Sequence, residues 1–122
     1  MIAAIEQALA EVCEQLDQAL VAADVWSTRT GLVYASYESD PATGPMLNTA
    51  VQDLRETLAA GGSGELDDLV VLDLYGKTAV VLVCPPGLGA VLVLDKHIDL
   101  ASVLTTTVPE LAERLRTAQA EA

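Results

Sequence analysis

Hydrophobic residues recur at helical spacing in three stretches of the chain, and this spacing predicts three helices. The first stretch carries the apolar residues Ile2, Ile5, Leu9, Val12, Cys13, Leu16 and Leu20. The second carries Met46, Leu47, Ala50, Val51, Leu54 and Leu58. The third follows Asp99, which is placed to act as an N-cap, and carries Leu100, Val103, Leu104, Val108, Leu111 and Leu115.

Glycine and proline mark the ends and interruptions of these helices. Pro45 suits the first turn of the second helix, and Gly61 is placed to cap its C-terminus. Pro109 falls inside the third stretch and leaves two alternatives open. Either the helix kinks at the proline, or a new helix begins with Thr107 as N-cap and Glu110 closing a capping box.

Five shorter segments predict β-strands. "DVWSTRTGLVYASY" predicts a hairpin that turns at Thr30 and Gly31. Three further strands are expected at about Leu66 to Tyr75, Lys77 to Cys84 and Gly89 to Lys96, separated by Gly76 and by "PPGLG". The links between these three are too short for crossover connections, so the strands form an antiparallel meander.

The resulting order, α-β-β-α-β-β-β-α, predicts a single α+β domain over residues 1–122 with a five-stranded antiparallel sheet. The meander strands are apolar on both faces, as in "TAVVLVC", so helices must cover both faces of the sheet. Five strands make a sheet about 24 Å wide, whereas a helix is about 10 Å across. If the first and last helices share one face, the middle helix lies alone on the other, and a second copy of the chain would complete that layer.

The composition narrows the classes of partner. Eighteen acidic and six basic residues give a net charge of −12, which disfavours binding to nucleic acid or to anionic membrane surfaces and favours a partner with a basic face. The N-terminal segment "MIAAIEQALAEV" lacks the basic region of a signal peptide. The longest uncharged run, "TAVVLVCPPGLGAVLVL", is interrupted at its centre by a turn signal, so we expect a soluble, cytoplasmic protein.

"YGKTAVVLV" resembles the end of a phosphate-binding loop, but the position of the first glycine of that motif is Val71. Strands are predicted on both sides of Gly76, whereas a phosphate-binding loop leads from a strand into a helix. We therefore interpret these residues as a tight turn and expect no nucleotide cofactor.

No set of residues predicts catalysis or metal binding. His97 is the single histidine and reads as an exposed connector, and Cys13 and Cys84 read as two buried, reduced thiols. Asp67 and Asp73 would lie on one face of a strand about 20 Å apart, which is too far to share a metal ion. Arg29, Arg55, Arg114 and Arg116 read as solvated surface charges, none of them an arginine finger.

The element order and turns resemble the Roadblock family of dynein light chains and bacterial GTPase regulators, within a profilin/Roadblock-like fold class. The residues that carry the resemblance are "VWSTRTGLVYASY", "DDLVVLDLYGKTAVVLV" and "PGLGAVLVLDKHIDLASVL". The similarity spans Ile2 to about Leu115. Pro109 and the unusually acidic composition depart from the family pattern.

The resemblance implies a non-enzymatic homodimer in which the third strands pair edge to edge and the second helices pack together. On this sequence the pairing strand is Leu69 to Leu74 and the helix is Met46 to Leu58. The dimer-interface residues expected from it are Leu47, Ala50, Val51, Leu54, Leu58, Leu69, Val70, Val71 and Leu72. The resemblance also implies a small Ras-like GTPase as partner; the alternative is a structural adaptor that binds no GTPase.

Overall fold

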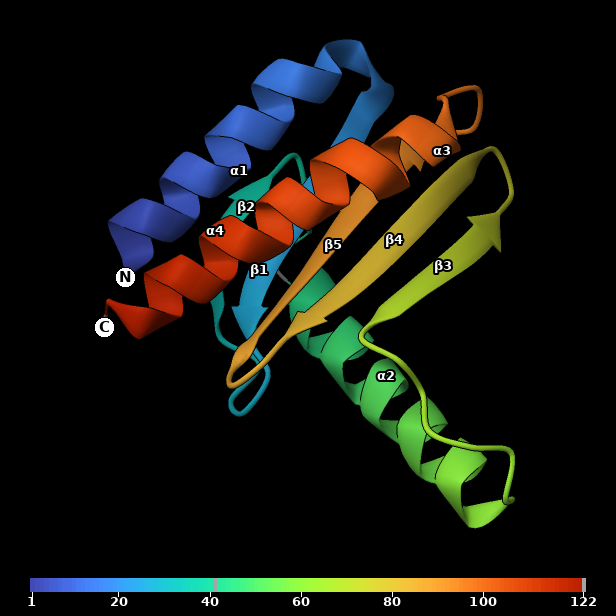
Figure 1. The fold of residues 1–122 in the computed structure, drawn as a ribbon. Helices are drawn as coiled ribbons and strands as arrows, with labels where there is room; N and C mark the ends of the chain where they lie inside the picture. The colour runs from blue at the N-terminus through green and yellow to red at the C-terminus, as the bar shows by residue number, and fades with distance from the viewer. Residues whose placement is uncertain (41, 122) are drawn as a thin grey trace.

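The predicted five-stranded antiparallel sheet is present in the computed structural model, which describes residues 1–40 and 42–121 (Figure 1). Its strands are β1 (Leu20–Ser27), β2 (Val33–Tyr37), β3 (Leu69–Leu74), β4 (Lys77–Cys84) and β5 (Leu88–Asp95). The spatial order is β2-β1-β5-β4-β3, and every neighbouring pair is antiparallel. The edge strands are therefore β2 and β3.

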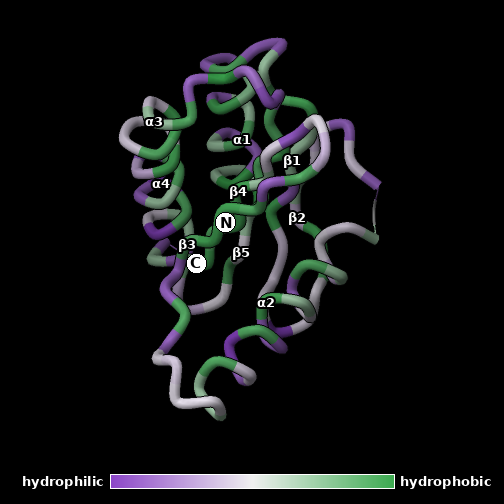
Figure 2. Tube along the Cα trace, turned by 90° about the vertical axis from the view of Figure 1, so that its right-hand side faces the viewer, coloured by the Kyte–Doolittle hydropathy of each residue, from purple (hydrophilic) through white to green (hydrophobic). Residues whose placement is uncertain are grey.

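Helices cover both faces of the sheet, as the sequence predicted. The first helix, α1 (Ile2–Leu16), and the last, α4 (Val108–Ala120), pack side by side on one face, and α2 (Thr43–Ala60) lies on the other (Figure 2). A 3-10 turn (Asp17–Ala19) links α1 to β1. The face under α1 and α4 holds the larger hydrophobic core, which extends from Ile5 and Leu9 across the sheet to Leu111 and Leu115.

The core under α2 is smaller and less completely covered. Its buried residues are Trp26, Val51, Ala79, Val81 and Val91. The helix packs on β1 and β5, and its C-terminal half continues past the sheet (Figure 1). Several apolar side chains on this face remain only partly buried, namely Val33, Leu47, Leu66, Val70, Leu72, Val83 and Val93.

Two glycines lie close to Trp26, one on the sheet and one on α2. A Cβ added to Gly89 of β5 would lie 2.7 Å from the ring atoms Cε2 and Cζ2, so only a glycine fits beneath the ring. A Cβ added to Gly44 of α2 would lie 3.4 Å from the Trp26 Cβ and 3.0 Å from a methyl of Val33. Trp26 is 1% exposed, and the two glycines let sheet and helix both approach it closely.

Leu20 belongs to β1, so the prediction that it continues the first helical stripe was wrong. The helix ends at Leu16 because Asp17 has non-helical dihedral angles, with φ of 48° and ψ of −123°. Leu20 then pairs with Leu94 of β5 at the start of β1, and the part of this strand that is buried on both faces begins at Ala23. The spacing of apolar residues is compatible with Leu20 in the helix, but pairing with β5 places it in the sheet.

The other boundaries differ from the predictions by a few residues. The first strand begins before "DVW", at Leu20, and β3 is shorter than Leu66 to Tyr75 because only residues 69–74 pair with β4. Asp67 consequently lies outside the strand. The turns predicted at Gly31 and Gly76 are confirmed, since both glycines have positive φ, 76° and 74°.

The residues predicted to begin and end α2 are confirmed. Pro45 lies in its first turn, and Gly61 is its C-cap. Beyond the cap, Gly62 has φ of 71°, its N–H donates to the Ala59 carbonyl at 3.3 Å, and the Ser63 N–H donates to the Leu58 carbonyl at 3.0 Å. These two bonds are those of a Schellman motif, which satisfies the last carbonyls of the helix.

Pro109 is accommodated by a π turn. The C-terminal helical region runs from α3 (Leu100–Ser102) through a π-helical segment (Val103–Thr107) into α4. Asp99 caps α3 as predicted, accepting a hydrogen bond from the Ser102 N–H at 3.4 Å. The capping-box alternative was wrong, because Thr107 has helical dihedral angles and its side chain makes no capping hydrogen bond.

Candidate interaction surface

One flank of α2 exposes a row of apolar side chains at intervals of four residues. We call Met46, Ala50, Leu54 and Leu58 the α2 ridge. Met46 is 66% exposed and Leu54 is 40% exposed, while Ala50 is exposed and Leu58 is partly buried. Side chains four residues apart form a continuous ridge on a helix surface, the feature that packs into the groove of another helix.

The residues predicted to form a dimer interface on α2 lie in two different environments. Val51 is buried against the sheet within the chain, and Leu47 packs partly against the same core. Ala50, Leu54 and Leu58 project along the α2 ridge. Helical periodicity identified the apolar positions, but it could not say which of them the chain's own sheet would cover.

The second exposed apolar feature is the edge strand β3. Within residues 1–40 and 42–121 it pairs with β4 alone, so its other side presents the open edge of the sheet, with backbone N–H and C=O groups that have no strand partner. Leu69 and Val71 pair with Leu82 and Val80 and share the α4 side of the sheet, and Val71 is 41% exposed. Val70 and Leu72 lie partly buried on the α2 side.

Arg55 connects these two features. Its Nη1 donates a hydrogen bond to the Leu66 carbonyl at 2.9 Å, which ties α2 to the segment before β3. Near the end of β3, the Asp73 Oδ1 forms an ion pair with the Lys96 Nζ at 2.7 Å. The Arg55 contact therefore joins α2 to the segment that leads into β3, and the Asp73–Lys96 ion pair joins β3 to the residue after β5.

The remaining arginines have ordinary surface surroundings. Arg114 pairs with Glu11 at 2.6 Å and so joins α4 to α1, and Arg116 pairs with Glu113 on its own helix. Arg29 is exposed at the tip of the β1–β2 hairpin. Within residues 1–40 and 42–121, no group of three or more histidines, cysteines or carboxylates is arranged to hold a metal ion.

The two cysteines differ in burial. Cys84 is buried, and desolvation raises the pKa of its thiol to about 11, against a lowering effect of Arg116 and a further raising effect of Asp68. Cys13 is only half-buried, contrary to prediction, because it lies where α1 meets the sheet edge β2; burial raises the pKa of its thiol too. His97 is exposed after β5, as predicted.

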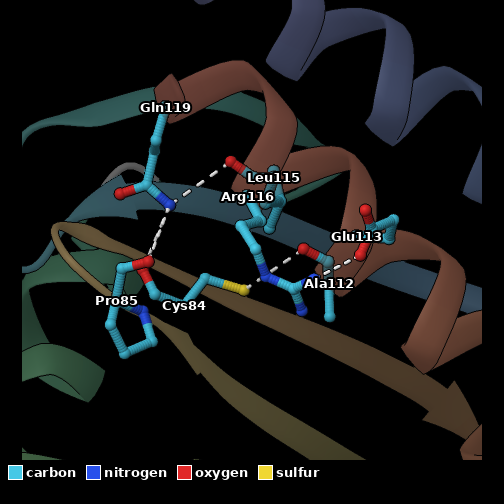
Figure 3. A network of polar contacts seen from close by, with 7 residues as sticks. All are labelled: Cys84, Pro85, Ala112, Glu113, Leu115, Arg116 and Gln119. Atoms are coloured by element: carbon cyan, nitrogen blue, oxygen red, sulfur yellow. Dashed lines mark hydrogen bonds and ion pairs between the residues drawn. The ribbon is translucent and has the colours of Figure 1, made fainter. Parts of the chain in front are cut away.

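A polar cluster that the sequence did not reveal joins α4 to the β4–β5 turn (Figure 3). The Gln119 Nε2 donates to the carbonyls of Cys84 and Pro85, at 3.2 and 3.4 Å, and its Oε1 accepts from the Gly87 N–H at 2.8 Å. The Cys84 Sγ lies 3.9 Å from the Ala112 carbonyl of the same helix. Gln119 therefore fixes the end of α4 over the turn.

Asp24 is the second buried polar group that sequence reasoning missed. It lies on β1 two residues before Trp26, and its Oδ2 accepts a hydrogen bond from the Ser39 hydroxyl. No side chain or backbone group in the described part of the chain donates to its Oδ1. Burial raises the pKa of this carboxyl, the Ser39 hydrogen bond lowers it, and the nearby Asp40 raises it.

Comparison with solved structures shows which fold this arrangement has. Myxococcus xanthus MglB superposes with a TM-score of 0.84 at 9% identity, over 98% of this chain and 90% of MglB. A Roadblock/LC7 domain from Streptomyces avermitilis gives 0.72 at 19% identity, over 93% and 96%. The chain has the Roadblock fold.

This result confirms the resemblance drawn from the sequence at the level of fold. Profilin II of Acanthamoeba castellanii also matches, with a TM-score of 0.58 at 17% identity over 83% of this chain and 88% of profilin, which confirms the broader fold class. No family model matches the chain, and no curated protein matches it in sequence. No helix in the described residues is long and apolar enough to cross a membrane.

Proposed function

We propose that this protein is a non-enzymatic, homodimeric regulatory module that binds a small Ras-like GTPase and modulates its activity or location. The proposal rests on the presence of two exposed features on one Roadblock fold, the α2 ridge and the open edge of β3. Both features expose apolar surface, and Arg55 holds the helix that bears the ridge to the segment that leads into β3.

In the proposed dimer, β3 pairs with β3 of a second copy and the two α2 ridges pack against each other. Strand pairing satisfies the free backbone groups of each edge and joins two five-stranded sheets into one. Packing of the ridges covers Met46 and Leu54, which the monomer leaves exposed. The apolar face of β3 that α2 leaves partly exposed, Val70 and Leu72, then lies beneath the shared helical layer.

Leu54→Glu tests the dimer. In a symmetric interface each substitution occurs twice, so the variant loses two leucine contacts and places two carboxylates in an apolar seam. We expect dimer affinity to fall by on the order of a hundredfold or more. Molar mass measured by light scattering over a dilution series should move from twice the 12.7 kDa chain mass toward that mass.

Gln52→Glu is the matched control. Position 52 lies two residues before Leu54 and so projects about 200° away around the helix axis, off the α2 ridge. This variant adds the same charge to the same helix and should keep the mass of the wild type. A wild-type chain that is monomeric throughout, or a Leu54→Glu variant that remains dimeric, removes this interface.

The GTPase part of the proposal has its own test. The probes are the small Ras-like GTPases of the organism that encodes this chain, each loaded with GTP or GDP and passed over the immobilised wild-type protein. Retention with altered GTP turnover supports regulation, and retention with unchanged turnover supports a role in location. No retention in either nucleotide state leaves a dimeric structural adaptor and refutes the GTPase proposal.

A further inference from the structure

A groove lies between α1 and the edge strand β2, at the opposite end of the sheet from β3. Its volume is about 390 Å³, within the range of small-molecule-binding clefts, roughly 300–1,000 Å³. The lining residues are Glu6, Leu9, Ala10 and Cys13 from α1 and Tyr34, Ala35, Ser36 and Tyr37 from β2.

The floor of the groove is apolar, and its rim is an open strand edge. Leu9 belongs to the main core, and Tyr34 and Ala35 pack partly against that core. Among the described residues β2 pairs with β1 alone, so one side of β2 has no strand partner there. An extended segment that added to this edge would direct alternate side chains over the groove and satisfy the free backbone groups of β2.

The charged residues of α1 and of residues 30–40 are all acidic, whereas Arg29 lies beyond Tyr34, in the adjoining cavity beside Gly87. No lysine or arginine occurs in α1 or anywhere in residues 30–54. Glu6 lines the groove, Glu14 follows Ala10 by one helical turn, and Glu38 comes directly after β2. In the described part of the chain none of these three carboxylates forms an ion pair, whereas Glu11, on the α4 side of the same helix, is paired with Arg114.

We propose that this groove binds an extended, basic segment of another protein, in which apolar residues alternate with lysine or arginine. The apolar residues enter the groove along β2, and the basic residues meet Glu6, Glu14 and Glu38. A second copy of this chain is the wrong occupant, because pairing β2 with β2 would bring the same carboxylates together without a counter-charge. The groove is separate from the α2 ridge and β3, so this proposal does not depend on the proposed dimer.

Cys13 reports occupancy of the groove directly. Its thiol lines the groove and is half-exposed, whereas Cys84 is buried beneath α4 and has a pKa of about 11, so it contributes little to modification near neutral pH. The probe is a short synthetic peptide that alternates lysine and valine, and its control alternates glutamate and valine. The measured quantity is the rate at which N-ethylmaleimide, an uncharged reagent, modifies the native protein.

We expect the lysine peptide to slow modification of Cys13 by about tenfold at roughly ten times its Kd, because only unoccupied protein reacts. The glutamate peptide should leave the rate unchanged, and added salt should reverse the protection. NMR shifts of backbone amides should map the peptide to α1 and β2. Equal protection by both peptides, or shifts centred elsewhere on the chain, would overturn the proposal.

Ala10→Arg fills the mouth of the groove and adds a positive charge at an exposed helical position that accepts arginine well. Protection of Cys13 by the lysine peptide, measured against each variant's own unprotected rate, should be lost. Ala101→Arg makes the same substitution at an exposed position on α3, away from the groove, and should keep the protection. If the lysine peptide still protected Cys13 in Ala10→Arg, the groove would not be its binding site. If the wild type is a dimer and Ala10→Arg dissociates it, the groove would be part of the dimer interface and would not hold such a segment.

Discussion

The close packing of Gly89 against Trp26 gives a stability prediction that can be worked out from distances. Gly89→Ala places a Cβ 2.7 Å from two ring carbons and 2.9 Å from the indole nitrogen, where ordinary contacts begin at 3.4 Å. The ring would have to move by about 0.7 Å, inside a buried cluster where Gly44 of α2 also approaches Trp26 closely. Forcing extra atoms into such a core costs about 1–3 kcal/mol.

Gly87→Ala is the matched control, two residues earlier in the same turn and strand. A Cβ at Gly87 meets its nearest atoms at 3.7–3.9 Å, and its φ is not in the left-handed region. This variant should therefore match the wild type or gain up to about 1 kcal/mol, because alanine restricts the unfolded chain. The difference between the variants isolates the ring contact from the general effect of replacing glycine.

Urea unfolding, followed by the fluorescence of Trp26, the single tryptophan, measures both variants. Protein concentration must be the same in every experiment, since self-association would add to the apparent stability. A Gly89→Ala variant as stable as Gly87→Ala would refute the reasoning. It would mean that the indole has an alternative position that the two glycines do not restrict.

The remaining predictions concern buried polar groups. Gln119→Ala removes the hydrogen bonds to the Gly87 N–H and to the Cys84 and Pro85 carbonyls, and it should lower the free energy of unfolding by about 1–3 kcal/mol. Gln7→Ala, at an exposed position, should change it by less than about 0.5 kcal/mol. Asp24 has a raised pKa in the folded protein, so the folded state holds its proton more tightly and stability is lost as pH rises from the unfolded pKa of about 3.9 through the folded pKa. Asp24→Asn should not lose stability in this way. Its free energy of unfolding, measured by urea titration, should therefore increase relative to that of the wild type as pH rises across the same interval. A difference in unfolding free energy that is the same at all pH values would contradict a raised pKa of Asp24.

The fold could be predicted from the sequence because its signals are local. Helical spacing, the turn glycines Gly31 and Gly76 and the Gly61 cap each depend on a few neighbouring residues, and each is present in the structure. Leu20 shows where such signals fail, since its spacing suits α1 while its partner, Leu94, is distant in the sequence. Boundaries are decided by tertiary pairing, which a single sequence does not display.

The candidate surfaces were only partly predictable for the same reason. Periodicity identified the apolar positions of α2, but Val51 and Leu54 differ only in which side of the helix the sheet reaches. The groove beside Cys13 arises because α1 leaves part of β2 uncovered, and Gln119 acts through a turn more than 30 residues away in the chain. Nothing near these residues in the sequence signals such contacts.

The π turn before Pro109 makes two positions of the chain depend on each other. A π turn amounts to one extra residue inserted into an α-helix, and here it precedes a proline that cannot donate a backbone hydrogen bond and whose ring would crowd the preceding turn of a regular helix. Deleting one residue from 103–107 would restore regular winding but leave the proline in conflict with it, whereas the same deletion combined with Pro109→Ala would remove the conflict. The insertion and the proline are therefore expected to be gained or lost together, as a compensated pair of changes within a helix that must keep Leu111 and Leu115 facing the core.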